Sequence, residues 1–347
     1  MTATARRFDA LIGTGGIGSG IVLALEGNAT VGREESRTAR LLDRRDYAKL
    51  HIICHYVRRL LGDGFAVLPI GAVGRDAAGT ALRRQMRSVG LDLRHVRSSA
   101  TASTLFAVGY VYPDGEGGNI TSLAASDTVT VEQVGRAVPA MRRHAARAIA
   151  LAVPESPVAA RLHLLDAAGE HGLYRVVSLS SGEIRDGRLN EFLPRCDLIA
   201  LNADEAAAVL GRDGPEGDPL AVARAAVARL RADNPSVQVI VTAGRHGSVS
   251  ADAHGVRHAP ALPVPPVSTA GAGDAHLAGA LAGLAAGADL HAANQLAAVV
   301  SALKVTSPHA INEQIDPAGV LRAARAWGVT VDPLATALLD DVARRRA

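Results

Sequence analysis

Between residues 147 and 242 the sequence alternates short, mainly apolar runs with longer segments of helical pattern. The runs predicted as buried strands are 147–153, 173–179, 197–201 and 237–242. The segments between them that are predicted as helices are 157–171, 203–210 and 219–232. Such alternation is typical of a doubly wound, mainly parallel α/β sheet. The short connections between these segments favour one continuous domain.

The N-terminal part of the chain predicts further strands and a hairpin. Residues 8–13 and 65–71 are apolar runs of strand length, and residues 76–89 follow a helical pattern. Two more strand patterns, 104–112 and 119–123, flank a glycine-rich turn at 113–118. Two strands joined by such a turn predict a β-hairpin.

These patterns lead to a prediction for the whole chain. We expect one α/β domain over residues 8–330 and a C-terminal helical tail over 331–347, with a surface helix at 335–346. Within the domain, a small β-strand lid is expected from elements at about 18–45 and 100–125.

Composition excludes several classes of function. Aromatic residues make up 3% of the 347 residues and the formal net charge is only +3, so no base-stacking surface for nucleic acid is expected. Two cysteines, Cys54 and Cys196, cannot build a disulfide framework. No apolar segment follows Arg6 and Arg7 as a signal peptide requires, and the apolar stretch 275–288 is too short to span a bilayer. We therefore expect a cytoplasmic protein with neither nucleic acid nor a membrane as partner.

The heptapeptide Ser268-Thr-Ala-Gly-Ala-Gly-Asp274 predicts a phosphate site. It stands before a long Ala/Leu/Gly helical run that begins near residue 275. A glycine-rich turn at a helix start directs backbone N–H groups and the positive helix dipole at one place. A carboxylate beside such an anion hole suits a base that takes the proton of a hydroxyl attacking phosphorus. The alternative is that Asp274 only caps the helix.

Two other strand ends carry candidate ligand-binding residues. Asn202 and Glu205 follow the strand 197–201 in a spacing that also forms a capping box. Thr242, Gly244 and Gly247 follow the strand 237–242. Ligands of open α/β sheets gather at the carboxyl ends of strands, although an ordinary turn is the alternative for the second group.

Other motifs support competing functions. Gly13-Thr-Gly-Gly-Ile-Gly18 follows a strand and matches the spacing of a dinucleotide-binding turn, which keeps an NAD-linked oxidoreductase open. However, the charged stretch 28–45 shows no apolar strand of the kind that this fold needs next. His51 and His55 are one helical turn apart, but no further metal ligands cluster with them. No Walker A sequence and no G-x-S-x-G element is present.

The segment 268–274, followed by Ala278-Gly-Ala-Leu281, resembles the C-terminal signature of the ribokinase-like (PfkB) sugar kinases. The segment from Ile70 to Gly79, continuing to Gly90-Leu-Asp92, is similar to another family segment. The resemblance extends with gaps from about residue 8 to residue 316. It implies the ribokinase-like fold with a lid, and an ATP-dependent kinase for a sugar-like small molecule.

The resemblance also assigns roles to residues. Asp274 is then the base, and the backbone of Gly271, Ala272 and Gly273 is the anion hole. Asn202 and Glu205 act on Mg²⁺ and phosphate, Glu205 through water, and the nucleotide lies along Thr242, Gly244 and Gly247. The family also implies a monovalent cation, and Ser268 replaces the first acid of the signature beside its site. A homodimer is implied by the resemblance alone.

The substrate half of the chain departs from the family. The glycine-rich, Asn-containing sugar motif is replaced by residues 48–53, and a Gly-Ala-Asn element by residues 124–126. The candidate substrate-binding residues in these places are Lys49, His51 and Ser126. Lys49 and His51, with the lid arginines Arg33, Arg37 and Arg40, raise the hypothesis of an acidic or phosphorylated acceptor. Because the family's sugar contacts are changed, a nucleoside kinase and a catalytically silent binding protein remain alternatives.

Overall fold

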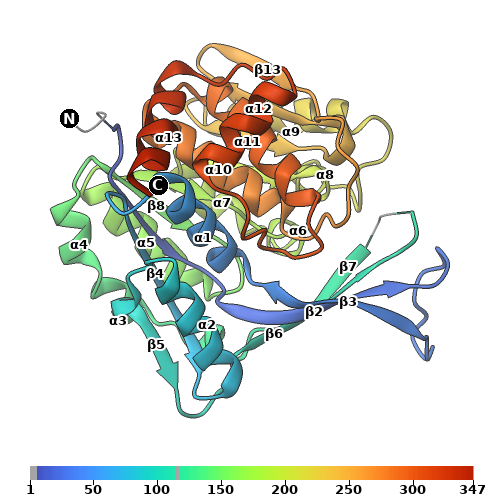
Figure 1. The fold of residues 1–347 in the computed structure, drawn as a ribbon. Coiled ribbons are helices and arrows are strands. Elements are labelled where there is room, and N and C mark those ends of the chain that lie inside the picture. Colours follow the sequence, from blue (N-terminus) through green and yellow to red (C-terminus); the bar gives the residue numbers. More distant parts are fainter. Residues whose placement is uncertain (1–5, 115–116, 347) are drawn as a thin grey trace.

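The computed structural model describes residues 6–114 and 117–346. A nine-stranded sheet runs through the main body, in the order β13-β12-β11-β10-β9-β8-β1-β4-β5 (Figure 1). Its strands are β1 (Ala10–Thr14), β4 (Ala66–Gly74), β5 (Val96–Ser99), β8 (Ala148–Ala152), β9 (Tyr174–Val177), β10 (Leu198–Asn202), β11 (Gln238–Thr242), β12 (Ser248–Asp252) and β13 (Gly255–Ala259). In this spatial order, all neighbouring strands between β11 and β5 pair in parallel. Strands β12 and β13 add an antiparallel edge beyond β11.

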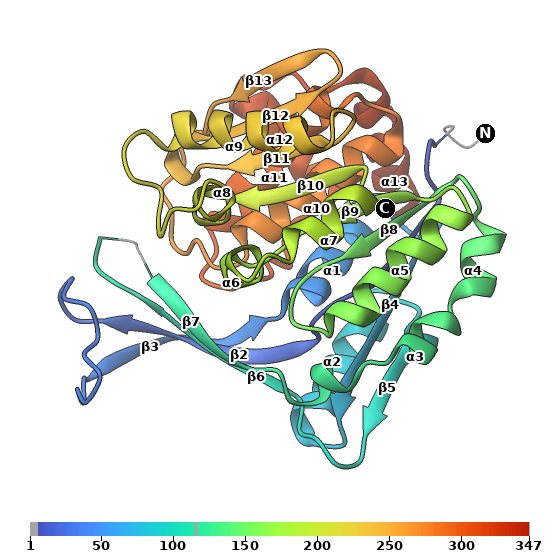
Figure 2. The same ribbon diagram turned by 180° about the vertical axis from the view of Figure 1, so that it is seen from behind.

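Helices cover both faces of this sheet, as Figures 1 and 2 show from opposite sides. One face carries α1 (Lys49–Leu61), α2 (Ala77–Ser88), α10 (Ala272–Ala286), α11 (Leu290–Val305), α12 (Pro317–Ala326) and α13 (Pro333–Arg346). The other face carries α3 (Val131–Gly135), α4 (Val138–Arg143), α5 (Val158–Glu170), α6 (Ser181–Arg185), α7 (Leu189–Phe192), α8 (Ala203–Val209) and α9 (Pro219–Asp233). The doubly wound α/β class predicted from the sequence is confirmed.

A second, four-stranded sheet projects from the body as a lid (Figure 1). Its order is β3-β2-β6-β7, with strands β2 (Gly18–Leu25), β3 (Ala39–Tyr47), β6 (Leu105–Val111) and β7 (Gly117–Ser122). Strands β2 and β6 pair in parallel, and the two outer pairs are antiparallel. The turn predicted at 113–118 includes residues 115 and 116, which lie outside the described residues.

Several boundaries differ from the sequence prediction. The charged stretch 28–45 contains most of β3, a lid strand in which all residues but one are exposed or half-buried, so that it shows no apolar run. Strands β5, β12 and β13 had no prediction. Helix α10 begins at Ala272 instead of near residue 275, because Gly271 adopts a left-handed conformation with φ of 74° that starts the helix earlier.

The C-terminal helix α13 packs into the same core as the rest of the body. Leu338, Leu339 and Val342 are buried among residues of α1 and α10. A side-chain carbon on Gly62 would lie 2.8 Å from Val342, so the glycine permits this close packing. The polar end of the helix carries three arginines.

Candidate active site

Side chains from five separate parts of the chain meet at the carboxyl ends of β10 and β11, beside the first turn of α10. They enclose a cavity of about 50 Å³, which has room for only a few water molecules. Its lining residues are Lys49, Ser178, Ala200, Leu201, Asn202, Glu205, Ile240, Thr242, Gly273, Asp274, His276 and Leu277. Five residues that the sequence nominated for catalysis or nucleotide binding, together with Lys49, therefore share one cavity.

Asp274 and Lys49 form an ion pair in this cavity. Asp274 stands in the first turn of α10 and Lys49 is the first residue of α1, and Lys49 Nζ lies 3.7 Å from Asp274 Oδ1. Burial raises the pKa of Asp274, and the neighbouring Lys49 ammonium opposes that rise. The carboxylates of Asp274, Glu205 and Glu155 together raise the pKa of Lys49, which keeps this lysine charged.

The turn before Asp274 offers N–H groups for an anion. The N–H of Ala272 donates to the Thr269 carbonyl at 3.0 Å, while the N–H groups of Gly271 and Gly273 have no backbone acceptor among the described residues. A side-chain carbon on Gly273 would point into open space, which is the room that a phosphate needs against the backbone. The fit to a phosphate group is therefore good at Gly271 and Gly273, whereas Ala272 is already engaged.

Asn202 and Glu205 form the capping box of α8. The Asn202 N–H donates to Glu205 Oε2 and the Glu205 N–H donates to Asn202 Oδ1, both at 2.8 Å. Glu205 is buried, and burial raises its pKa while Lys49 opposes the rise. Its second oxygen, Oε1, accepts no hydrogen bond from the described residues. One carboxylate oxygen facing a phosphate cradle fits Mg²⁺, which usually takes few protein ligands and several oxygens from phosphates and water.

The turn after β11 is shaped by glycines. Gly244 and Gly247 have positive φ values of 53° and 89°, and a side-chain carbon on Gly247 would lie 2.1 Å from the Ala259 carbonyl. Only glycine fits such a position. Thr242 reaches the cavity at the end of β11, while the two glycines form the 3₁₀ turn η4 (Gly244–His246) and its end.

The other candidate substrate residues lie away from the cavity wall. His51 is fully buried in α1 with its ring 4.8 Å from that of Tyr47, and burial lowers its pKa to about 3. His55 is also buried, and burial lowers its pKa to about 4. Among the described residues no group of three or more His, Cys, Asp or Glu is arranged to hold a metal ion. Ser126 is buried and accepts a hydrogen bond from the Ile17 N–H at 3.3 Å.

The turn Gly13–Gly18 leads into strand β2 and not into the helix that a dinucleotide-binding fold requires, so that reading is corrected. Its glycines serve packing. A side-chain carbon on Gly15 would lie 2.3 Å from Val153, and one on Gly16 would lie 2.3 Å from Glu155 Oε2. The turn therefore makes room for the end of β8 and for the Glu155 carboxylate.

Two acids beside the cavity escaped sequence reasoning. Glu155 follows β8, has a positive φ of 70° and accepts a hydrogen bond from the Lys49 N–H at 3.1 Å. Burial raises its pKa to about 7. Asp46 at the end of β3 has its pKa raised to about 6 by burial, with Asp274 adding to the rise. Glu155 is the second residue after the predicted strand 147–153, and that position at a strand end was the available signal.

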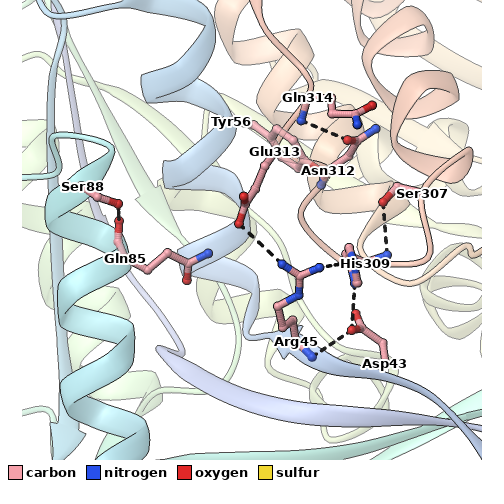
Figure 3. Close-up of polar contacts among 10 residues, drawn as sticks. All are labelled: Asp43, Arg45, Tyr56, Gln85, Ser88, Ser307, His309, Asn312, Glu313 and Gln314. Atoms are coloured by element: carbon pink, nitrogen blue, oxygen red, sulfur yellow. Dashed lines mark hydrogen bonds and ion pairs between the residues drawn. The ribbon is translucent and has the colours of Figure 1, made fainter.

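A polar cluster joins the lid to the loop between α11 and α12 (Figure 3). His309 Nδ1 and Asp43 Oδ1 lie 2.8 Å apart, and the Arg45 guanidinium contacts the other ring nitrogen of His309. Arg45 also approaches Glu313 at 3.9 Å. We call Asp43, Arg45, His309 and Glu313 the lid latch. The same loop reaches the anion hole, because a side-chain carbon on Gly271 would lie 2.8 Å from the Ala310 carbonyl.

Comparison with known proteins decides the family. Residues 53–316, well over half of the chain, match the family described as pfkB family carbohydrate kinase. The chain belongs to the PfkB family of carbohydrate kinases. The predicted resemblance is thus confirmed, while Lys49 and the lid strands β2 and β3 precede the matched region.

A relative of this chain is a fructokinase of Klebsiella pneumoniae, 40% identical over 98 residues. The match covers 28% of this chain and only 29% of that protein. Solved structures of similar fold include ribokinase from Giardia lamblia, with a TM-score of 0.75, 18% identity and coverage of 93% of this chain and 100% of that one. Ribokinase from Cryptococcus neoformans in complex with ADP has a TM-score of 0.73 at 21% identity, covering 91% and 99% of the two chains.

A nucleoside kinase of Burkholderia thailandensis, in complex with inosine, has a TM-score of 0.70 at 20% identity and covers 92% of this PfkB chain and 99% of its own. At these identities the likeness establishes the ribokinase-like fold. Within the described part of the chain, no helix combines the length and apolar character needed to cross a bilayer.

Proposed function

We propose that this PfkB protein transfers the γ-phosphoryl group of ATP to a hydroxyl of a sugar or sugar-like small molecule. The observation that carries the proposal is the half-buried Asp274 carboxylate beside the open backbone of Gly273, in one cavity with Glu205 and Thr242. A base next to an anion hole serves a hydroxyl that attacks phosphorus.

Asp274 would accept the proton of the acceptor hydroxyl. The acceptor oxygen forms a bond to the γ-phosphorus, the bond from that phosphorus to the β,γ-bridging oxygen breaks, and ADP leaves. Asp274 must be ionised to act, although burial raises its pKa. The Lys49 ammonium at 3.7 Å favours the carboxylate form and so keeps the base available at neutral pH.

The protein would stabilise the transferring group mainly by fixed dipoles. The N–H groups of Gly271 and Gly273 and the positive end of α10 would face the negative charge of the transferring phosphoryl group. Phosphoryl transfer depends mainly on such positioning and electrostatic stabilisation. Glu205, held by Asn202, would contact Mg²⁺ through water. The nucleotide would lie along Thr242, Gly244 and Gly247. Bound Mg²⁺ would supply neutralisation of phosphate charge.

The acceptor end favours a neutral molecule over the acidic one that the sequence suggested. Glu155 and Asp46 add carboxylates next to Lys49 and Asp274, so an anionic acceptor would meet repulsion. Carboxylates are good acceptors for hydroxyl protons of a polyol. The lid arginine Arg37 is already bonded to Glu35 and to the Ala29 carbonyl.

The test is ADP formation from ATP and Mg²⁺ with separate panels of neutral sugars, sugar acids, phosphosugars and nucleosides. We expect a rate that depends on a neutral sugar-like acceptor. A rate with nucleosides alone would replace the proposal by a nucleoside kinase. If ATP binds but none of the panels raises ADP formation, the protein is a silent binding relative and the proposal is wrong.

A further inference from the structure

Lys304 is a fully buried cation next to the anion hole. It lies in the last turn of α11 with no exposed surface, and its Nζ donates to the backbone carbonyl of Ser268 at 2.8 Å. Among the described residues it makes no ion pair within 4.0 Å. Burying a charge without a close counter-charge is costly, so a purely structural role would be better served by an apolar side chain.

Longer-range charges keep this ammonium protonated at neutral pH. Burial lowers the pKa of Lys304 to about 8, and the carboxylates of Asp46, Asp43 and Asp274 oppose that change. The negative end of α11 is also favourable for a cation. The charged ammonium therefore interacts electrostatically with the two lid carboxylates, Asp46 and Asp43, and with the carboxylate of Asp274.

The carbonyl that Lys304 binds belongs to the segment that leads to the anion hole. The N–H groups of Val267 and Ser268 both donate to the Val305 carbonyl, at 2.7 and 3.2 Å. With the Lys304 bond, three hydrogen bonds fix this segment to the end of α11. Gly271 follows three residues after Ser268, so the path of the segment sets where the anion hole lies.

The surrounding carbonyls leave little for a metal ion. The Ala310 carbonyl accepts from the Tyr56 hydroxyl at 3.3 Å, and the Leu303 carbonyl accepts from Asn312 Nδ2 at 3.0 Å. The Val305 carbonyl accepts from the N–H groups of Val267 and Ser268, and the Ser268 carbonyl accepts from Lys304 Nζ. Monovalent cations bind to clusters of free carbonyl oxygens. The residues around Ser268 therefore do not fit the monovalent cation that the family resemblance implied.

The residue type also suits this position. All but two of the 37 basic residues are arginines, and the two lysines, Lys49 and Lys304, both lie at the site. An ammonium is a compact point charge, whereas a guanidinium is wide and planar. Of the two basic side chains, a lysine is the one that comes closer to the size of a single dehydrated cation.

We propose that the Lys304 ammonium is a built-in cation that holds the segment 267–273 in its active shape, so that catalysis needs no monovalent metal ion. The catalytic part of this inference rests on the proposed kinase function. The structural part of the inference, that the stability of the folded protein does not depend on a monovalent metal ion, does not rest on that function.

The test compares wild type with Lys304→Met in KCl, NaCl and tetramethylammonium chloride at constant ionic strength. Two readouts are taken: the rate of acceptor-dependent ADP formation and the thermal unfolding midpoint. We expect wild type to show the same values in all three salts. Lys304→Met should lose about tenfold or more in rate without metal cations, as expected for a lost charge-assisted hydrogen bond, and regain it selectively in K⁺ or Na⁺.

Arg58→Met is the matched control. Arg58 is a buried cation near the end of α1 that donates to the Gly90 carbonyl at 3.1 Å, at the other end of that helix from the site. Its variant should lose stability without acquiring a preference for any cation. This arm separates the specific role of Lys304 from the general effect of removing a buried charge.

A selective response of wild type to K⁺ or Na⁺ would overturn the inference, and that arm stands even if Lys304→Met fails to fold. A folded Lys304→Met that equals wild type in tetramethylammonium would overturn it too. If no acceptor is found, the kinase proposal fails, but the unfolding midpoints still decide whether Lys304 replaces a metal cation.

Discussion

The Lys49 ammonium lies 3.7 Å from the Asp274 carboxylate, and both residues line the same cavity. Lys49 starts α1 and Asp274 stands in the first turn of α10, so the pair depends on two helices packing side by side. The Lys49 ammonium lowers the pKa of Asp274 and so favours the ionised carboxylate.

Lys49→Met should move the pH dependence of the rate. Burial raises the pKa of Asp274 and Lys49 lowers it, so removing the ammonium raises this pKa further. We expect the acidic limb of the kcat profile to shift upward by about one pH unit or more. Lys49→Arg, which keeps a cation, should shift it less. An acidic limb that is unchanged in Lys49→Met would show that the ion pair does not control Asp274.

The two glycines before Asp274 should respond differently to alanine. At Gly273 the added carbon meets open space, so Gly273→Ala should keep its unfolding midpoint while losing activity. At Gly271 the added carbon meets the Ala310 carbonyl in a left-handed conformation, so Gly271→Ala should also lose at least about 1 kcal/mol of stability. Thermal unfolding and rate measurements distinguish them. Full activity in Gly273→Ala would contradict the assignment of the anion hole.

The lid latch should show energetic coupling. Asp43 is buried, and its Oδ1 lies 2.8 Å from His309 Nδ1, a contact between the lid and the loop that Figure 3 marks with a dashed line. Asp43→Asn, His309→Ala and the double variant form a cycle for kcat/KM of the acceptor. We expect a coupling free energy of about 0.5–3 kcal/mol, the range for contacting residues. Strictly additive effects would mean that the contact does not help close the lid.

Glu155→Gln should change how stability depends on pH. Burial raises the pKa of Glu155 from 4.5 to about 7, so the folded state keeps a proton there that the unfolded state releases. The contribution of Glu155 to the free energy of unfolding is therefore present at acidic pH and falls as pH rises through 7. Relative to wild type, Glu155→Gln should gain up to about 3 kcal/mol between pH 4.5 and pH 8 in urea titrations. The exposed Glu216→Gln is the control and should show no such gain; a flat difference for Glu155→Gln would contradict the account.

The parallel core was predictable from the sequence because its strands are buried on both faces. The run 237–242 is mainly apolar for this reason, and its buried centre, Val239 to Val241, lies in β11. Strand β3 was not predictable in the same way, because its exposed positions carry Arg44 and other charged residues. Strand β3 forms by pairing with β2, and pairing between separate segments leaves no pattern in the local sequence.

The residues of the candidate site also differ in whether a local sequence motif marks them. Asp274 and Glu205 lie in local motifs that place a carboxylate at a helix start, so the sequence alone nominated them. Glu155 and Lys304 act through contacts with distant segments, and a single lysine in an Ala-rich helix gives no local signal. His51 was nominated because it lies in the segment 48–53 that replaces the family's sugar motif, but the packing places its ring against that of Tyr47.

The most direct test of the central claim is the rate of Asp274→Asn with the acceptor that the panels identify. The exposed Asp204→Asn, in the first turn of α8, is the matched control. The account predicts that Asp274→Asn loses about a hundredfold or more in kcat, because a general base contributes about 10²–10⁴-fold, while ATP still binds in calorimetry. A rate for Asp274→Asn close to that of Asp204→Asn would show that Asp274 is not the base.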